Sequence, residues 1–367
     1  MKFSRRLPPE MLPNALTGLL YAKRQSGTRI LDLTESNPTH AGIRYPEGFL
    51  KSLASDRVLR YEPEPFGLSS AREVIAQEYR AAADRILLTA STSEAYSWLF
   101  KLLCDPGDEV LVPRPSYPLF EYLAALESVT VRHYGLFYDH GWFIDFHTIR
   151  QAMSPRTRAI ILVNPNNPTG HFLKRHELAE LTAFGLPVIA DEVFRDYTLQ
   201  PAEDSLLSLQ GASDTLVFTL NGLSKTVGLP QMKLAWTIVD GPPDLVRQTM
   251  GRLEIIADTY LSAGTPVQIA LPTLLNLRDS VQTQIRERLG ENLGTLKSSG
   301  LKALDVEAGW YSVVAYEEGA EIRLLRDHDV LVQPGYFYDF EKSGYIVISL
   351  LTRPDVFVEG IRRLQLP

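Results

Sequence analysis

The stretch RAIILVNPNNPTGHFLKRHELAELTAFGLPVIADEV, residues 158–193, contains the pattern that decides the fold. It opens with an apolar, β-branched run (158–164) and breaks in the turn-forming NPNNPTG (164–170). Helical spacing with a closing glycine follows (174–185), and a second apolar run (187–193) ends the stretch. Short apolar runs are typical of buried strands, whereas Asn-Pro steps and glycine are typical of turns. The stretch therefore predicts strand, turn, helix and strand, the repeating unit of a parallel sheet.

The same alternation extends outward on both sides, with helical segments such as 93–105 between strand-like runs. These further runs are RILLTA (85–90), DEVLVP (108–113), SVTVRHY (128–134), TLVFTL (215–220) and LAWTIV (234–239). We predict an α/β fold whose large domain has a mostly parallel sheet covered by helices on both faces. Ligands of such sheets bind at the carboxyl ends of the strands.

The pattern changes after residue 241, first to long helical segments and then, from residue 301, to short strands mixed with short helices. This change predicts a smaller α+β C-terminal domain, since a chain of 367 residues exceeds the usual size of one domain. We divide the chain into an N-terminal arm (1–45), a large domain (46–285) and the small domain (286–367). The arm is expected to join the small domain or to pack on a partner subunit.

Composition favours a globular protein that acts on small molecules. Hydrophobic residues make up 45% and charged residues 22% of the chain, and the net charge of -7 comes without a basic block. This argues against nucleic-acid and membrane partners. The single cysteine, Cys104, excludes an intrachain disulfide and a cysteine-rich metal site, and the N-terminal residues show no apolar segment before a cleavage-like site. We therefore expect a cytoplasmic location, no metal and no membrane span.

Polar residues follow three of the predicted strands. NPNNPTG taken alone is typical of a tight loop. Asp191 ends an apolar run, and a buried carboxylate is costly without a cation or a hydrogen-bond donor nearby. The next residue, Glu192, is interpreted as a helix cap or a surface carboxylate. Lys225 lies among small and apolar residues in NGLSKTVGLPQMKLAW (221–236). Desolvation favours the neutral amine, which can attack a carbonyl. Because a lysine is most often a solvated surface residue, the hypothesis that Lys225 forms a Schiff base also needs the support of NPNNPTG and Asp191.

The ordered set NPNNPTG, ADEVFRDY (190–197) and LSKTVGLP (223–230) resembles the class I and II aminotransferases of fold type I. Weaker matches extend the resemblance over nearly the whole chain, namely RYEPEPFGLSSAREVIAQEY (60–79), LLTASTSEA (87–95), VLVPRPSYPLFE (110–121), TPVQIA (265–270) and LVQPGYFYDF (331–340). The resemblance implies the pyridoxal 5'-phosphate transferase fold and a homodimer. It also implies an enzyme that moves an amino group from an amino acid to a keto acid through a Schiff base on Lys225.

The resemblance implies roles for four residues around the cofactor ring. Lys225 would hold the cofactor and, once displaced by substrate, would move the proton between the substrate Cα and the cofactor. Asp191 would pair with the ring nitrogen and keep it protonated, so that the ring can accept electrons. Asn167 would donate to the phenolic oxygen. Tyr117 would stack on the ring, with an ordinary core aromatic as the alternative.

Phosphate binding is implied at a second set of residues. Ser91 and Thr92 open a helix directly after a strand, where backbone N–H groups and the helix dipole favour an anion. Lys233 occupies the usual position of an arginine and could still bind phosphate as a point charge. Tyr61 resembles the tyrosine that reaches the phosphate from the partner subunit, which would complete the active site across a homodimer interface.

The sequence departs from the family pattern at further positions. Phe194 replaces a tyrosine that donates to the phenolic oxygen, and Gly222 replaces a serine that contacts phosphate. Val347 stands where an arginine commonly binds the substrate α-carboxylate. Either Arg353 or Arg44 takes over that role, with surface solvation as the alternative for both, or the carboxylate is held in another way.

These departures keep a second function open. Besides an aminotransferase, the residues fit another pyridoxal-phosphate enzyme on the same scaffold, such as a β- or γ-lyase, a cyclase or an oxidase. A cofactor-binding regulator is a third alternative. It ranks last because the arm is too short for a DNA-binding domain with a linker and because Lys225 is retained.

Overall fold

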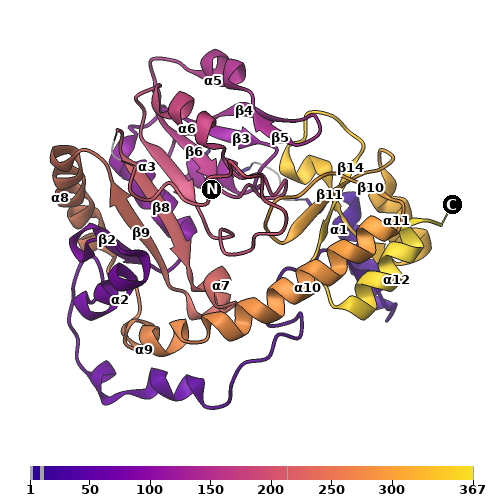
Figure 1. Cartoon of the computed structure of the whole chain (residues 1–367), viewed down its shortest axis with the longest axis horizontal. Coiled ribbons are helices and arrows are strands. Elements are labelled where there is room, and N and C mark those ends of the chain that lie inside the picture. Colours follow the sequence, from indigo (N-terminus) through magenta and orange to yellow (C-terminus); the bar gives the residue numbers. More distant parts are fainter. Residues whose placement is uncertain (1–2, 9–11, 213, 367) are drawn as a thin grey trace.

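The computed structural model describes residues 3–8, 12–212 and 214–366 (Figure 1). Its centre is an eight-stranded sheet with the order β2-β9-β8-β7-β6-β3-β4-β5. The strands from β8 to β4 run parallel, whereas β9 is antiparallel to β8 and β2, and β5 is antiparallel to β4. The bounds are β2 (Ile86–Thr89), β3 (Glu109–Arg114), β4 (Thr130–Tyr138), β5 (Trp142–Ile144), β6 (Thr157–Val163), β7 (Val188–Asp191), β8 (Val217–Gly222) and β9 (Ala235–Asp240).

Helices cover both faces of this sheet because its strands are apolar on both sides. Neighbouring residues of β3 show this alternation, since Val110 packs in the cluster under α3, α4 and α8, while Leu111 packs in the cluster under α5 and α6. The remaining helices of this part include α2 and α9, which contact each other near β2. The bounds are α2 (Ser69–Tyr79), α3 (Thr92–Leu103), α4 (Phe120–Leu126), α5 (Phe146–Ala152), α6 (Arg175–Thr182), α7 (Leu223–Thr226), α8 (Pro243–Tyr260) and α9 (Thr265–Leu275).

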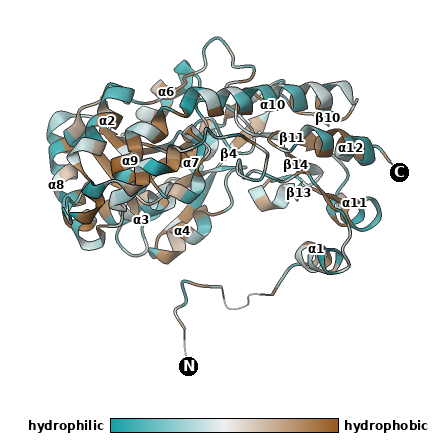
Figure 2. Ribbon diagram, turned by 90° about the horizontal axis from the view of Figure 1, so that it is seen from below, coloured by the Kyte–Doolittle hydropathy of each residue, from teal (hydrophilic) through white to brown (hydrophobic). Residues whose placement is uncertain are grey.

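A second, antiparallel sheet with the order β10-β11-β14-β13 lies in the C-terminal part, toward the yellow end of the chain in Figure 1. Helix α1 packs against α11, as Figure 2 shows, and the short strand β1 pairs in parallel with β12. Helix α10 runs from the large sheet to this part (Figure 1). The bounds are α1 (Ala15–Gln25), β1 (Leu31–Asp32), α10 (Arg278–Ser298), β10 (Lys302–Ala303), β11 (Tyr311–Ala315), α11 (Ala320–His328), β12 (Val330–Leu331), β13 (Gln333–Pro334), β14 (Tyr345–Ser349) and α12 (Pro354–Leu364).

The predicted fold class is confirmed: a mostly parallel sheet is covered on both faces, and a small antiparallel sheet follows it. Every strand predicted between residues 85 and 239 is present, and β5 adds one that was not predicted. The predicted boundary between residues 285 and 286 falls inside α10, so the division into domains stays a prediction. Of the helices that the described residues form, none has the length and apolar character needed to cross a bilayer.

Candidate active site

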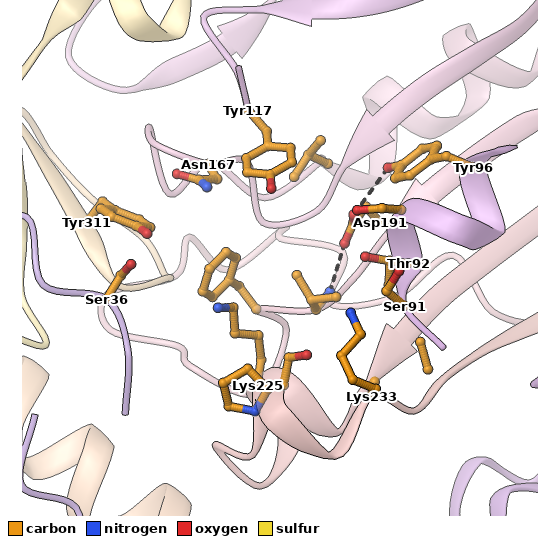
Figure 3. Close-up of a pocket in the computed structure, with 18 residues that line it drawn as sticks. Ser36, Ser91, Thr92, Tyr96, Tyr117, Asn167, Asp191, Lys225, Lys233 and Tyr311 are labelled. Carbon is orange, nitrogen blue, oxygen red and sulfur yellow. Dashed lines mark hydrogen bonds between the residues drawn. The ribbon is translucent and has the colours of Figure 1, made fainter. Parts of the chain in front are cut away.

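A pocket of about 340 Å³ lies where β6, β7 and β8 end and α3 begins (Figure 3). Because these strands are parallel neighbours, the residues that follow them gather at one edge of the sheet. Most of the residues predicted for the site line this pocket, namely Ser91, Thr92, Tyr117, Asn167, Asp191, Lys225 and Lys233. The structure thus brings together residues that lie more than a hundred positions apart in the chain.

Lys225 projects into the middle of the pocket from α7, the short helix after β8 (Figure 3). Its backbone is fixed by the Tyr197 hydroxyl, which donates to the Lys225 carbonyl at 2.5 Å. Its Nζ lies 4.6 Å from the ring centre of Trp310 and 5.3 Å from that of Phe194. Burial lowers the pKa of Lys225 to about 8, although the charge of Asp191 opposes this shift. A substantial share of neutral, nucleophilic amine is therefore present near neutral pH.

Asp191 is the last residue of β7, and its side chain is held in place by two donors. The Tyr96 hydroxyl donates to Oδ2 at 3.2 Å, and the Val193 backbone N–H donates to Oδ1 at 3.2 Å. Burial raises the pKa of Asp191 to about 6, while both hydrogen bonds and the charge of Lys225 act in the opposite direction. A carboxylate desolvated to this degree is stabilised by an additional cation beside it.

Glu192, the neighbour of Asp191, is not the surface carboxylate that the sequence suggested. It is fully buried, and it accepts from the Ser208 hydroxyl at 2.6 Å and from the Leu209 backbone N–H at 2.7 Å. Burial raises the pKa of Glu192 to about 7. Its side chain lies outside the residues that line the pocket, so its role is to tie the loop after residue 205 to the sheet.

Asn167 lies in a turn that is held in place by contacts with the C-terminal part of the chain. Gly170 has a φ of +72°, and a Cβ at this position would lie 2.4 Å from the Ala308 carbonyl oxygen, so only glycine fits. Lys174, shortly after the turn, forms an ion pair with Glu307 at 2.5 Å. The Asn167 side chain is buried, and its Oδ1 has no hydrogen-bond partner among the described residues. A buried amide without a partner is typical of a ligand-binding position.

Tyr117 enters the pocket from the segment between β3 and α4 (Figure 3). Its ring packs edge-on against Phe120 at 5.9 Å, which fixes its orientation. Burial raises the pKa of Tyr117 to about 12, and the charge of Asp191 adds to this shift. The Tyr117 hydroxyl therefore stays protonated throughout the physiological range.

The N-terminus of α3 forms one end of the pocket. Ser91 is its N-cap and accepts from the Glu94 backbone N–H at 3.2 Å, whereas the backbone N–H groups of Thr92 and Ser93 have no partner within the helix. Thr92, Ser93 and the exposed Lys233 line the same end. A Cβ on Gly222 would lie 3.0 Å from both the Ala235 Cβ and the Leu234 carbonyl oxygen, which explains the absence of a serine there. This end suits an anion.

Three predicted residues lie away from this pocket. Tyr61 is 80% exposed and lines a different cavity of its own chain. Neither Arg353 nor Arg44 lines the pocket: Arg353 is exposed and pairs with Asp355 at 3.2 Å, and Arg44 is exposed beside Gln284. Neither arginine thus stands in this chain's pocket in place of the one missing at Val347, and a role for either in substrate binding stays a prediction.

Sequence reasoning missed several lining residues. Tyr96 follows Thr92 by four positions, so helical spacing alone could have placed it on the same face of α3. Ser93 and Ser224 adjoin predicted residues. Ser36 and Tyr311 carry no comparable signal, because they come from the two ends of the chain and meet only through the small sheet.

Comparisons with known proteins agree with this geometry. The family described as "Aminotransferase class I and II" matches residues 29–356. The glutamate-pyruvate aminotransferase AlaA of Escherichia coli (strain K12) is 33% identical over 278 residues, which are 71% of this chain and 67% of that protein. An aminotransferase structure from Escherichia coli has a TM-score of 0.86 at 24% identity, covering 99% of this chain and 97% of the other. Alanine aminotransferase from Pyrococcus furiosus has a TM-score of 0.85 at 23% identity, covering 99% and 98%.

The chain therefore belongs to the class I and II aminotransferase family, as the sequence motifs predicted. It is an aminotransferase of fold type I, and this family is one of pyridoxal-phosphate-dependent enzymes.

Proposed function

We propose that the Lys225 pocket binds pyridoxal 5'-phosphate and transfers an amino group between an amino acid and a keto acid. The observation that carries this proposal is the meeting of a desolvated lysine amine and a buried carboxylate in one pocket. Lys225 and Asp191 both line it, and burial shifts the pKa of each toward neutrality. Perturbed groups of this kind concentrate at catalytic sites.

The residues present fit this cofactor. The side-chain N–H of Asn167, which lines the pocket, can donate to the phenolic oxygen, and Asp191 can accept from a protonated ring nitrogen. The N-terminus of α3 and Lys233 offer N–H donors and a positive charge to the phosphate. When bound, the cofactor supplies an electron sink for the substrate carbon and a carbon atom that accepts the amino group.

Each of these residues has a distinct task in the transfer. Lys225 would bind the cofactor through its neutral amine. Once displaced by substrate, this amine would accept the proton of the substrate Cα and carry it to the cofactor. Asp191 would pair with the protonated ring nitrogen, and the Tyr96 hydroxyl fixes the carboxylate for that purpose. Tyr117 would cover the bound ring and exclude water from it.

We further propose a homodimer in which Tyr61 serves the phosphate end of the partner's pocket. Tyr61 and Leu59 are 80% and 84% exposed, and Leu50 on the same segment is 50% exposed. Exposed apolar side chains gathered on one segment favour a contact with another chain. Tyr61 has no role in the pocket of its own chain, which fits a task in the partner's.

Replacing Lys233 with alanine is expected to weaken cofactor binding by about tenfold, because one charge-assisted contact to phosphate is lost. Lys233→Arg should restore most of the affinity. The measurement is the dissociation constant from visible absorbance during cofactor titration, at low and at high salt, since an exposed charge contributes less when screened. Lys297→Ala, which removes an exposed lysine on α10, is the matched control. Unchanged affinity in Lys233→Ala would remove Lys233 from the phosphate site.

The proposed function is tested by adding donors one at a time to cofactor-loaded protein without an acceptor. Alanine and glutamate come first, because the relative from Escherichia coli is named a glutamate-pyruvate aminotransferase. We expect the visible absorbance of the bound cofactor to convert to that of its amine form, with one equivalent of pyruvate or 2-oxoglutarate released. A keto acid formed together with free ammonia would instead identify a lyase or an oxidase.

A further inference from the structure

The end of the pocket opposite the phosphate site is built by the C-terminal part of the chain. Tyr311 on β11 and Ser36 after β1 lie there, across Lys225 from Ser91 and Lys233 (Figure 3). Tyr311 is 9% exposed. Burial raises the pKa of its hydroxyl, and a hydrogen bond with Ser36 opposes that shift. Two neutral hydroxyls thus face the space that remains for substrate.

This substrate end has no cation of its own. Among the described residues that line the pocket, the positively charged ones are Lys225, which the cofactor engages, and Lys233 at the phosphate end. Glu35, next to Ser36, places a negative charge close enough to raise the pKa of Tyr311 further. An anion at this end would therefore meet a like charge and no counter-ion, which is unfavourable in a desolvated site.

The small sheet fixes this arrangement. Ser349 pairs with Tyr311 across β11 and β14. Its backbone N–H donates to the Leu33 carbonyl oxygen and its hydroxyl to the Glu35 carbonyl oxygen, both at 2.6 Å. One residue thereby positions both hydroxyls. On the same face of the sheet, Val347 is fully buried opposite Val313, so this pair of positions supplies no cation.

Resting on the proposed function, we propose that Tyr311 and Ser36 form a neutral hydrogen-bonding subsite for the group attached to the amine-bearing carbon of the substrate. This subsite accepts donors in which that group is an amide or a hydroxyl at rates comparable to those of the matching α-amino acid. A hydroxyl pair can donate to and accept from neutral groups, whereas a guanidinium selects for a carboxylate. Tyr311 and Ser36 are thus specificity-determining residues.

The test compares L-alanine, L-alaninamide and L-alaninol, which differ only in that group. The second-order rate constant of the first half-reaction is measured by absorbance with wild-type, cofactor-loaded protein. We expect the amide and the alcohol to react within about tenfold of alanine or faster, as the absence of a charged clamp requires. A preference for alanine of about 100-fold or more would overturn the proposal, because it demands a cation at this end, for instance from a partner subunit.

Two variants test whether Tyr311 and Ser36 cause the preference among the three donors. Tyr311→Phe keeps the ring that packs edge-on against Phe194 and removes the hydroxyl, and it should lower the rate constants for the amide and the alcohol by about tenfold. Ser36→Lys adds a cation and should shift the preference toward alanine by about tenfold or more. Tyr336→Phe, at a 57% exposed tyrosine outside this pocket, is the control.

A readout independent of turnover separates substrate binding from damage to the site. Cofactor affinity and the melting temperature should stay at wild-type values in Tyr311→Phe, and a loss of cofactor affinity equal to the loss of rate would overturn the assignment.

Failure of the neutral subsite can be distinguished from failure of the proposed function. Absence of reaction with all three donors and with glutamate contradicts the proposed function itself, whereas reaction with the amino acids alone contradicts only the neutral subsite.

Discussion

Replacing Lys225 with alanine is expected to abolish amino transfer, with turnover falling by a factor of about 10⁴ or more, because the nucleophile and the proton carrier are the same amine. The visible absorbance of covalently held cofactor should vanish as well. The measurement is the absorbance spectrum after cofactor addition, followed by the donor half-reaction. Lys233→Ala is the matched control, since it removes the other lysine of the pocket and should keep the covalent band. Full activity in Lys225→Ala would refute the proposed active site.

Two further measurements distinguish a chemical loss from a structural one. Burial lowers the pKa of Lys225 to about 8, so the charged amine is disfavoured by the fold at neutral pH. Removal of that amine should therefore leave the melting temperature unchanged or higher. In the wild type, the rate of cofactor capture should rise between pH 7 and pH 9, roughly following the neutral fraction of a group with this pKa.

Replacing Asp191 with asparagine is expected to lower the rate of the half-reaction by roughly 100- to 1,000-fold, while the covalent band remains. Asparagine keeps the size of the side chain but cannot keep a ring nitrogen protonated, so the ring accepts electrons poorly. Single-turnover absorbance with a saturating donor measures this step directly. An asparagine variant with wild-type rates would show that Asp191 is only structural.

The neighbouring carboxylate provides the control for Asp191. Glu192 is also buried, but it accepts from Ser208 and Leu209 and pairs with Arg195 outside the pocket. Glu192→Gln keeps an acceptor for the Leu209 N–H and can donate to the Ser208 hydroxyl, so it should keep the half-reaction near the wild-type rate. Tyr96→Phe, which removes the donor to Asp191 Oδ2, should lie between the two variants with a loss of a few-fold, about the effect of one hydrogen bond.

Much of the site could be predicted because its residues follow strands that are neighbours in the sheet. Asn167, Asp191 and Lys225 lie at or shortly after the ends of β6, β7 and β8, and strand periodicity together with turn residues locates all three in the sequence. Ser91 and Thr92 are predictable for a similar reason, since a helix N-terminus after a strand has a clear signature.

The rest could not be predicted because it depends on contacts between the ends of the chain. The strands β1 and β12, which bring the segment of Ser36 to the small sheet, are two residues long each and leave no periodic pattern. Tyr311 precedes Val313 in an ordinary buried strand, and nothing in the sequence distinguishes the first from the second as a pocket residue. For the same reason, the sequence does not show that Arg44 and Arg353 lie outside the pocket of this chain.

The contacts that hold the Asn167 turn in place have a consequence for a chain that is only partly synthesised. A nascent chain that has emerged only to residue 300 already carries Lys225, Asp191 and Asn167. However, Gly170 then lacks the Ala308 backbone against which it packs, and the Lys225 amine lacks the Trp310 ring beside it. We therefore expect a chain that ends before Ala308 and Trp310 to bind the cofactor more weakly than the full chain does.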